Sequence, residues 1–320
     1  MTKIMKQITL ITTCVVILII TLTRPVRAAD VFADAATTPA FMRDIHVVSA
    51  GGYRVGGANT SDGQNTGMSY DYLFVASNIW NNEHNQVLGG IQFGRREFDH
   101  KLALPDGFDM PDRLDNASAA LLYKHITSGD WSISQGIRYT RSWTDSPSMT
   151  VRDTFDLVGL AVISREPGVA WAFGYIYTQT ESTKDRVYPV IEYINNAHDR
   201  WSFTLGYPVL NFAFSPHPDW MLSGGGISYK VTEQNIARLS YAGDNWAYRL
   251  EGPEVKPVSY TAQRVGLDWT YLYHIDHRTV VVLNASLGWE FKRKLGSDNK
   301  DNKLSMDDAA VMGFNASLSF

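Results

Sequence analysis

The connections between the apolar segments of this chain alternate in length, and this alternation restricts the fold more than any single motif. Every second connection, such as 127–130 or 232–235, is short and rich in turn-forming residues. Most of the others are longer, and 99–113 and 292–307 are much longer. A soluble sandwich has no reason to sort its connections in this way. The pattern predicts an up-and-down antiparallel barrel with short turns at one end and long loops at the other.

Apolar and polar side chains alternate within the segments, as they do when the two faces of a strand meet different surroundings. In 277–291, for example, Leu283, Leu287 and Trp289 share one face, whereas Ser286 and Glu290 share the other. We expect about 14 strands, with 12 or 16 as alternatives because Gly243 and Asp244 interrupt one segment. The expected strands are 44–57, 66–80, 86–98, 114–127, 130–143, 154–165, 169–181, 186–194, 200–212, 219–232, 235–251, 258–274, 277–291 and 308–320.

The first 28 residues read as a secretory signal peptide. Lys3 and Lys6 precede a long apolar run, and Val26-Arg27-Ala28 forms a small-residue cleavage site. We therefore expect a signal peptide over 1–28, cleaved near Ala28, then a short lead over 29–43 and a barrel over 44–320.

Charge and cysteine content exclude several classes of protein. Without residues 1–29 the chain keeps 25 basic and 33 acidic residues, a net charge of −8, which argues against a nucleic-acid partner. Cys14 is the only cysteine and lies in the predicted signal peptide, so the mature chain has no disulfide and no thiolate metal site.

The last strand resembles the closing strand of Gram-negative outer-membrane β-barrels, because it is amphipathic and ends in an aromatic residue. The resemblance implies that Phe314, Leu318 and Phe320 face lipid and form a signal read by the barrel-assembly machinery, while Asn315, Ser317 and Ser319 face the lumen. It also implies that 308–320 pairs with both 44–57 and 277–291. The predicted fold class is all-β, a single transmembrane antiparallel barrel with short periplasmic turns and longer extracellular loops.

Charged residues on the faces opposite the apolar ones are candidates for the lumen lining. They form either a selective polar pore or an interior salt-bridge network that largely fills the barrel, since unpaired charge in a narrow lumen is costly. The candidates are Arg54, Asp71, Arg96, Lys124, Arg138, Asp156, Glu192, Arg238, Arg249, Asp268 and Glu290.

Evidence for catalysis is weak. Some outer-membrane barrels are hydrolases, and the nearest feature here is Asp99-His100 beside an acidic loop. Catalysis would need a second acid or nucleophile within hydrogen-bond reach of this pair, and none of the motifs of those enzymes is present. The sequence predicts no catalytic residue, no metal ligand and no cofactor.

Size and strand count are similar to those of the fatty-acid and aromatic-hydrocarbon transporters, although residues 30–43 are too short for their N-terminal plug. Segments 188–193 and 205–208 are similar to families of uncharacterised exported barrels, which imply no specific activity. We expect an outer-membrane channel or uptake protein for a small solute, in contact with membrane lipids and lipopolysaccharide. The alternatives are a plugged structural or adhesive barrel whose outer loops bind lipopolysaccharide or a partner and, third, an outer-membrane hydrolase.

Overall fold

The chain forms strands of length 7 to 20 residues, apart from two short ones, and consecutive strands run antiparallel. The computed structural model describes residues 46–99, 102–127, 130–146, 149–166, 168–179, 186–207, 224–251, 255–276, 279–296 and 303–320. The strands are β1 His46–Asn59, β2 Asn65–Asn81, β3 Asn85–Phe98, β4 Arg113–Ile126, β5 Trp131–Thr144, β6 Thr150–Val151, β7 Thr154–Glu166, β8 Val169–Thr178, β9 Arg186–Asn195, β10 Trp201–Tyr207, β11 Gly224–Lys230, β12 Asn235–Glu251, β13 Val255–His274, β14 Val280–Gly296, β15 Lys303–Met306 and β16 Ala309–Ser319.

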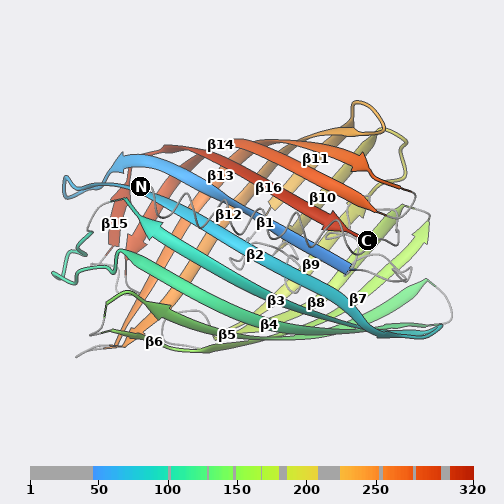
Figure 1. Ribbon diagram of the computed structural model, residues 1–320, viewed down its shortest axis with the longest axis horizontal. Coiled ribbons are helices and arrows are strands. Elements are labelled where there is room, and N and C mark those ends of the chain that lie inside the picture. Colours follow the sequence, from blue (N-terminus) through green and yellow to red (C-terminus); the bar gives the residue numbers. More distant parts are fainter. Residues whose placement is uncertain are drawn as a thin grey trace.

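The sheet closes on itself. β1 pairs with both β2 and β16, and β11 pairs with both β10 and β12, so every long strand has two antiparallel neighbours. The described residues therefore form a closed barrel of 14 strands, with β6 and β15 as additions (Figure 1). Closure gives each long strand a hydrogen-bonded neighbour on both sides, as a sheet needs in order to cross a bilayer.

The predicted barrel is confirmed in its main features. The last strand pairs with the first, from Val47 opposite Ser319 to Val55 opposite Val311, and with β14 on its other side. Gly243 and Asp244 do not interrupt β12, whose pairing with β13 is continuous. Residues 1–43, which hold the predicted signal peptide and lead, lie outside the described residues.

Large apolar side chains are exposed on the outer wall, at positions that alternate with buried ones. Such a continuous apolar belt around a closed barrel is the lipid-facing surface of a transmembrane protein. Its members include Ile91, Phe93, Leu121, Ile133, Tyr175, Ile191, Leu205, Leu239, Leu267, Leu287 and Phe314. No helix among the described residues is long and apolar enough to cross a membrane.

Exposed tryptophans mark one border of this belt. Trp131, Trp171 and Trp201 each follow a short turn and lie on the outer wall, where the Trp201 ring packs 4.6 Å from Tyr229. Amphipathic rings at this position favour the boundary between lipid and water. We call this the short-turn end, and the opposite end, with the longer connections, the long-loop end.

The closing strand differs in one respect from the expected arrangement. Ser317 and Ser319 are buried on the inner side, and Phe314 is exposed on the outer side. Leu318 lies on the outer side by alternation, yet only 6% of it is exposed, so it does not present an open surface to lipid. The ring of Phe320 stacks on His46 at 5.4 Å, joining the C-terminus to the first strand.

Candidate functional site

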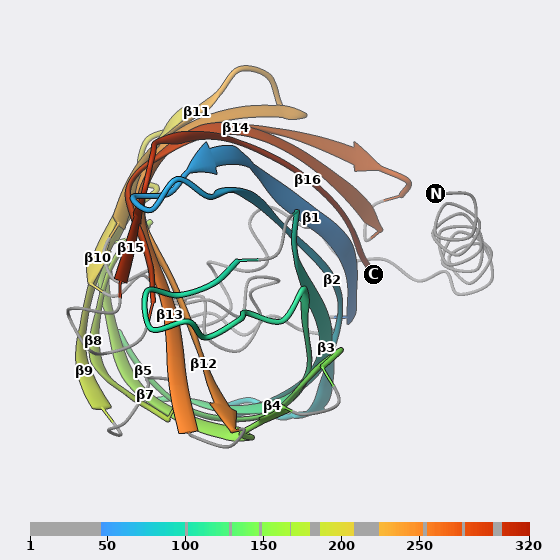
Figure 2. The same cartoon turned by 90° about the vertical axis from the view of Figure 1, so that its left-hand side faces the viewer.

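The ends of β12 and β13 lean across the long-loop end of the barrel. Within the described residues, β12 pairs with β11 as far as Ala242, whereas its pairing with β13 continues to Glu251. Beyond Ala242 these two strands form a ribbon in which 243–251 pairs with 255–263, and Leu250 of the ribbon pairs with Val151 of β6. Since β6 follows β5 on a distant part of the wall, the ribbon spans the opening, as Figure 2 shows.

The connection between β3 and β4 also folds inward at this end. Leu102, Leu104 and Met110 are buried in the same apolar cluster as the ribbon residues. Gly107 has a positive φ of 78° and its amide donates to Leu104 O at 2.8 Å, which closes a tight turn after Pro105. This loop is therefore part of the barrel interior and not only a solvated acidic loop.

Arg96 connects β3 to the β12–β13 ribbon. It projects inward from β3, and its Nη1 donates to Tyr248 Oη of β12 at 2.9 Å, a contact between residues 152 positions apart. Its guanidinium lies 4.4 Å from the Trp246 ring centroid and 4.9 Å from that of Tyr70. A fully buried guanidinium held between aromatic faces has a strong cation–π attraction, because water no longer competes for the cation.

Gly94 makes room for this arrangement. A Cβ at Gly94 would lie 2.3 Å from Tyr70 Oη and 2.8 Å from Asn116 Oδ1. Tyr70 Oη in turn accepts a hydrogen bond from Gln92 Nε2 at 3.2 Å. A larger residue at position 94 would push the Tyr70 ring away from Arg96.

A second group of charges lies beside the first. Glu290 is fully buried and accepts hydrogen bonds from Tyr260 Oη and from Arg264, whose Nε lies 3.0 Å from Oε1. Arg293 Nε donates to Tyr260 Oη at 2.9 Å and lies 3.6 Å from Glu290 Oε2. The Tyr260 and Trp246 rings stack at 5.4 Å, so the two groups form one arginine–aromatic cluster.

A bulge in β14 brings Arg293 into this cluster. Residues three apart on a regular strand point to opposite faces, yet Glu290 and Arg293 are both fully buried and in contact. The register between β13 and β14 shifts between Thr261 and Gln263, and Lys292 has a φ of 53°. The extra residue reverses the alternation, so Arg293 points inward.

The short-turn half of the interior is more polar. Ser317 Oγ donates to Ser49 Oγ at 2.8 Å, and Ser240 Oγ donates to Asp268 Oδ2 at 3.2 Å. Ser132 Oγ and Ser134 Oγ are buried and have no hydrogen-bond partner among the described residues. Hydroxyl groups with spare hydrogen-bonding capacity suit a lining that contacts water or a polar solute.

The structure places eight of the predicted lining residues on the inner side of the wall, by their alternation with the exposed belt. They are Arg96, Lys124, Arg138, Asp156, Glu192, Arg238, Asp268 and Glu290. It brings together Arg138 and Asp156, whose Nε–Oδ2 and Nη2–Oδ2 distances are 3.0 and 2.8 Å. Of the others, only Arg96 and Glu290 belong to the arginine–aromatic cluster. The side chain of Arg249 lies outside the described residues.

Arg54 and Asp71 differ from the expectation, because they lie on the outer wall. Tyr53 and Val55 take the buried positions beside Arg54, and Tyr70 and Tyr72 take those beside Asp71. Arg54 pairs with Asp99 at 2.8 Å on the exposed side. Near the long-loop end, aromatic and apolar residues therefore fill the interior, and charged residues lie on the outer wall. The outer wall can carry charge there because it lies beyond the apolar belt.

Several residues of the cluster were not identifiable from alternation alone. Tyr70, Trp246, Tyr248 and Tyr260 belong to a class that also forms interfacial girdles, and Arg293 is displaced by the bulge. The sequence does contain one indication of the cluster. Aromatic residues lie on both sides of the short connection 252–254, at 246 and 248 before it and at 260 after it.

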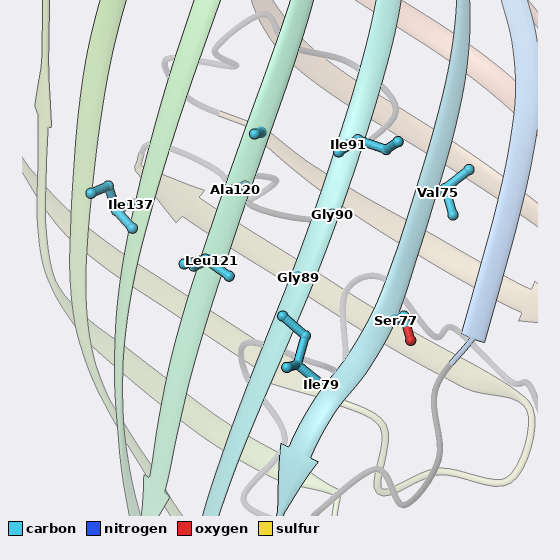
Figure 3. A pocket seen from close by; sticks show the side chains of 10 residues that line it. Val75, Ser77, Ile79, Gly89, Gly90, Ile91, Ala120, Leu121 and Ile137 are labelled. Carbon is cyan, nitrogen blue, oxygen red and sulfur yellow. The ribbon is translucent and has the colours of Figure 1, made fainter.

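The outer wall carries an apolar hollow of about 480 Å³ over β2 to β5. Figure 3 shows Ile79, Ile91 and Leu121 around it. Because these residues belong to the lipid-facing belt, the hollow is a surface for lipid chains and not part of the interior. Among the described residues no group of His, Cys, Asp or Glu could hold a metal ion. Asp99 is engaged with Arg54, and His100 lies outside the described residues.

Comparison with known proteins finds distant similarity to solved structures. No protein-family model and no curated protein matches it. A FadL homologue of Pseudomonas aeruginosa is similar, with a TM-score of 0.49 and 12% identity, covering 89% of this chain and 91% of that one. The TodX deltaS2S3 mutant monoaromatic hydrocarbon channel has a TM-score of 0.43 and 7% identity over 93% and 96% of the two chains. A BenF-like porin from Pseudomonas fluorescens Pf-5 has a TM-score of 0.36 and 9% identity, covering 88% of this chain and 100% of that one. That this chain is a closed antiparallel barrel rests on its own strand pairing.

Proposed function

We propose that the protein is a Gram-negative outer-membrane barrel that admits a small solute through its lumen, and that the arginine–aromatic cluster closes the long-loop end. The observation that carries this proposal is the Arg96–Tyr248 contact, which joins two non-neighbouring walls by side chains. Such a contact can separate without breaking the hydrogen-bonded ladder of the barrel. The polar inner surface at the other end supports passage of a hydrated solute.

In this proposal Arg96 and Glu290 belong to the closing cluster, and other predicted lining residues line the route. The Arg138–Asp156 pair, together with Glu192 and Lys124, keeps the inner wall charged along the route. Export through the signal peptide, contact with lipopolysaccharide, and recognition of Phe314, Leu318 and Phe320 by the barrel-assembly machinery belong to the same proposal. No enzymatic role is proposed.

Planar-bilayer conductance of the chain from residue 29 onward tests the proposal. We expect small or intermittent currents for the unaltered protein and a larger, steadier conductance for Arg96→Ala, because the cation that joins the walls is removed. Arg54→Ala, which removes an arginine from the outer wall, is the matched control and should leave the conductance unchanged. Absence of current above background in all three proteins would overturn the channel.

The cross-lumen contacts also favour the second candidate, a permanently filled barrel with a structural role. The buried inward loop 102–110 and the ribbon already occupy the long-loop end. If Arg96→Ala folds normally and conducts no ions, the closure is permanent and the structural role is the better description.

A further inference from the structure

Two buried hydrogen-bond donors of the arginine–aromatic cluster have no partner among the described residues. They are Trp246 Nε1 and Arg293 Nη2, each on a side chain at least nine-tenths buried. Buried donors are normally satisfied, since leaving one without an acceptor costs its hydration. Both belong to side chains that contact Tyr260, Trp246 through ring stacking and Arg293 through its Nε.

The charges at this point favour an anion. Arg264 and Arg293 both contact the single carboxylate of Glu290, which also accepts the Tyr260 hydroxyl. The remaining Arg293 nitrogens are divided between Asp307 O, 2.9 Å from Nη1, and the unpartnered Nη2. A planar guanidinium with one free N–H edge suits a carboxylate oxygen.

The surroundings of these donors favour a flat apolar body. The Trp246 and Tyr260 rings are nearly parallel, with an interplanar angle of 16°, and Tyr248 meets Trp246 edge-on at 5.7 Å. Aromatic groups pack against one another in these stacked and edge-on geometries. The existing contacts of Arg96 with a ring and a hydroxyl show that the cluster accepts aromatic groups beside guanidinium.

We propose that the cluster is a binding site for a small aromatic carboxylate, whose carboxylate accepts hydrogen bonds from Arg293 Nη2 and Trp246 Nε1 while its ring packs among Trp246, Tyr248 and Tyr260. This assignment rests on the proposed function, because it names the class of solute that the barrel admits. The solute satisfies donors that the closed state leaves without acceptors.

Calorimetric titration of the folded chain with three probes tests this assignment. Benzoate carries both ring and charge, phenol carries the ring without the carboxylate, and acetate carries the charge without the ring. We expect benzoate to bind roughly tenfold or more tightly than either of the others, since each lacks one of the two sets of contacts. Equal binding of the three, or no binding of benzoate, would overturn the assignment.

Trp246→Phe sharpens the test, because phenylalanine keeps a ring and removes only the N–H. Benzoate affinity should fall roughly tenfold in this variant and remain unchanged in Trp289→Phe, which alters an exposed tryptophan on the outer wall. Retained benzoate affinity in Trp246→Phe would contradict the proposed contact. Arg293→Gln gives a second measurement, and heat-modifiable gel migration establishes that each variant is folded.

Conductance and binding separate the two proposals. Ionic current in Arg96→Ala without benzoate binding would leave the channel intact and show that the solute class is wrong. Benzoate binding with no current or benzoate flux in any variant would support the site and contradict the channel.

Discussion

Ser317 Oγ donates a hydrogen bond to Ser49 Oγ at 2.8 Å, although the two residues are 268 positions apart. Both lie on the inner side of the seam between β1 and β16, where Ser49 is directly opposite Ser317 in the strand register. The seam is the last pairing that closure requires, because every other neighbouring pair is joined by a connection within the chain. Its geometry therefore reports whether the barrel is closed.

A disulfide should form across this seam. Ser49→Cys combined with Ser317→Cys, in the chain from residue 29 that lacks Cys14, should oxidise readily because the two side chains already touch. The crosslinked protein should migrate as a compact form on a non-reducing gel even after boiling. Ser49→Cys with Ser286→Cys is the matched control, since Ser286 pairs with Gly313 and not with Ser49. Crosslinking in the control and not in the pair would contradict the register.

Leu267→Arg should destabilise the folded barrel by about 2–4 kcal/mol, because Leu267 is exposed in the middle of the apolar belt, between Leu239 and Leu287. A soluble protein would tolerate an arginine at such an exposed position. Urea titration in lipid vesicles measures the difference. Val231→Arg, at an exposed apolar residue in a short turn, should cost only about 0–1 kcal/mol.

Arg138→Met should cost about 3–5 kcal/mol, because it leaves the fully buried Asp156 carboxylate without its cation. Thr178 Oγ1, 2.6 Å from Asp156 Oδ1, would still donate a hydrogen bond to the carboxylate. Addition of Asp156→Asn should recover part of the loss. Arg54→Met breaks an exposed pair of similar length and should cost less than about 1 kcal/mol in the same urea titration.

Lys292→Gly should be neutral or stabilise the barrel by up to about 1 kcal/mol, because its positive φ is unfavourable for a residue with a Cβ. The same change at Lys294, in the regular strand beyond the bulge, should be destabilising. Deletion of Lys292 should restore the regular alternation and keep Arg293 inward, because Arg293 would then be the second residue after Glu290. Equal effects of the two glycine substitutions on urea stability would argue against the bulge.

Low pH should loosen the turn between β1 and β2. The hydrogen bond from Thr60 is the main cause of the lowered pKa of Asp62, and Gln64 adds to it. Because the pKa in the folded state lies below the ordinary value of 3.8, the stabilisation is present above that value and is lost as pH falls through the folded pKa.

Gln64 transmits this change to the inward loop, since it exchanges two hydrogen bonds with the Ala103 backbone, at 2.9 and 3.0 Å. The Ala103 amide signal in NMR spectra should therefore shift below about pH 4. Asp62→Asn should remove this titration, whereas Asp106→Asn, in the same loop region, should leave it in place.

Alternation and the parity of the connections were sufficient to predict a closed antiparallel barrel with its two ends correctly sorted. Both are local properties, because a strand that separates lipid from an interior must alternate along its length. They also placed residues such as Arg138, Asp156 and Glu290 on the inner side of the wall.

Contacts across the barrel were not predictable in this way. Arg96 meets Tyr248 only because the β12–β13 ribbon leans over the opening toward β3. Arg293 joins Glu290 only through a bulge that reverses the alternation, and Arg54 lies outside because Tyr53 fills the interior. The sequence alone therefore determined that the chain forms a closed barrel and which faces of most strands point inward. The tertiary structure decided which side chains meet within it, because those contacts depend on shape and register and not on period.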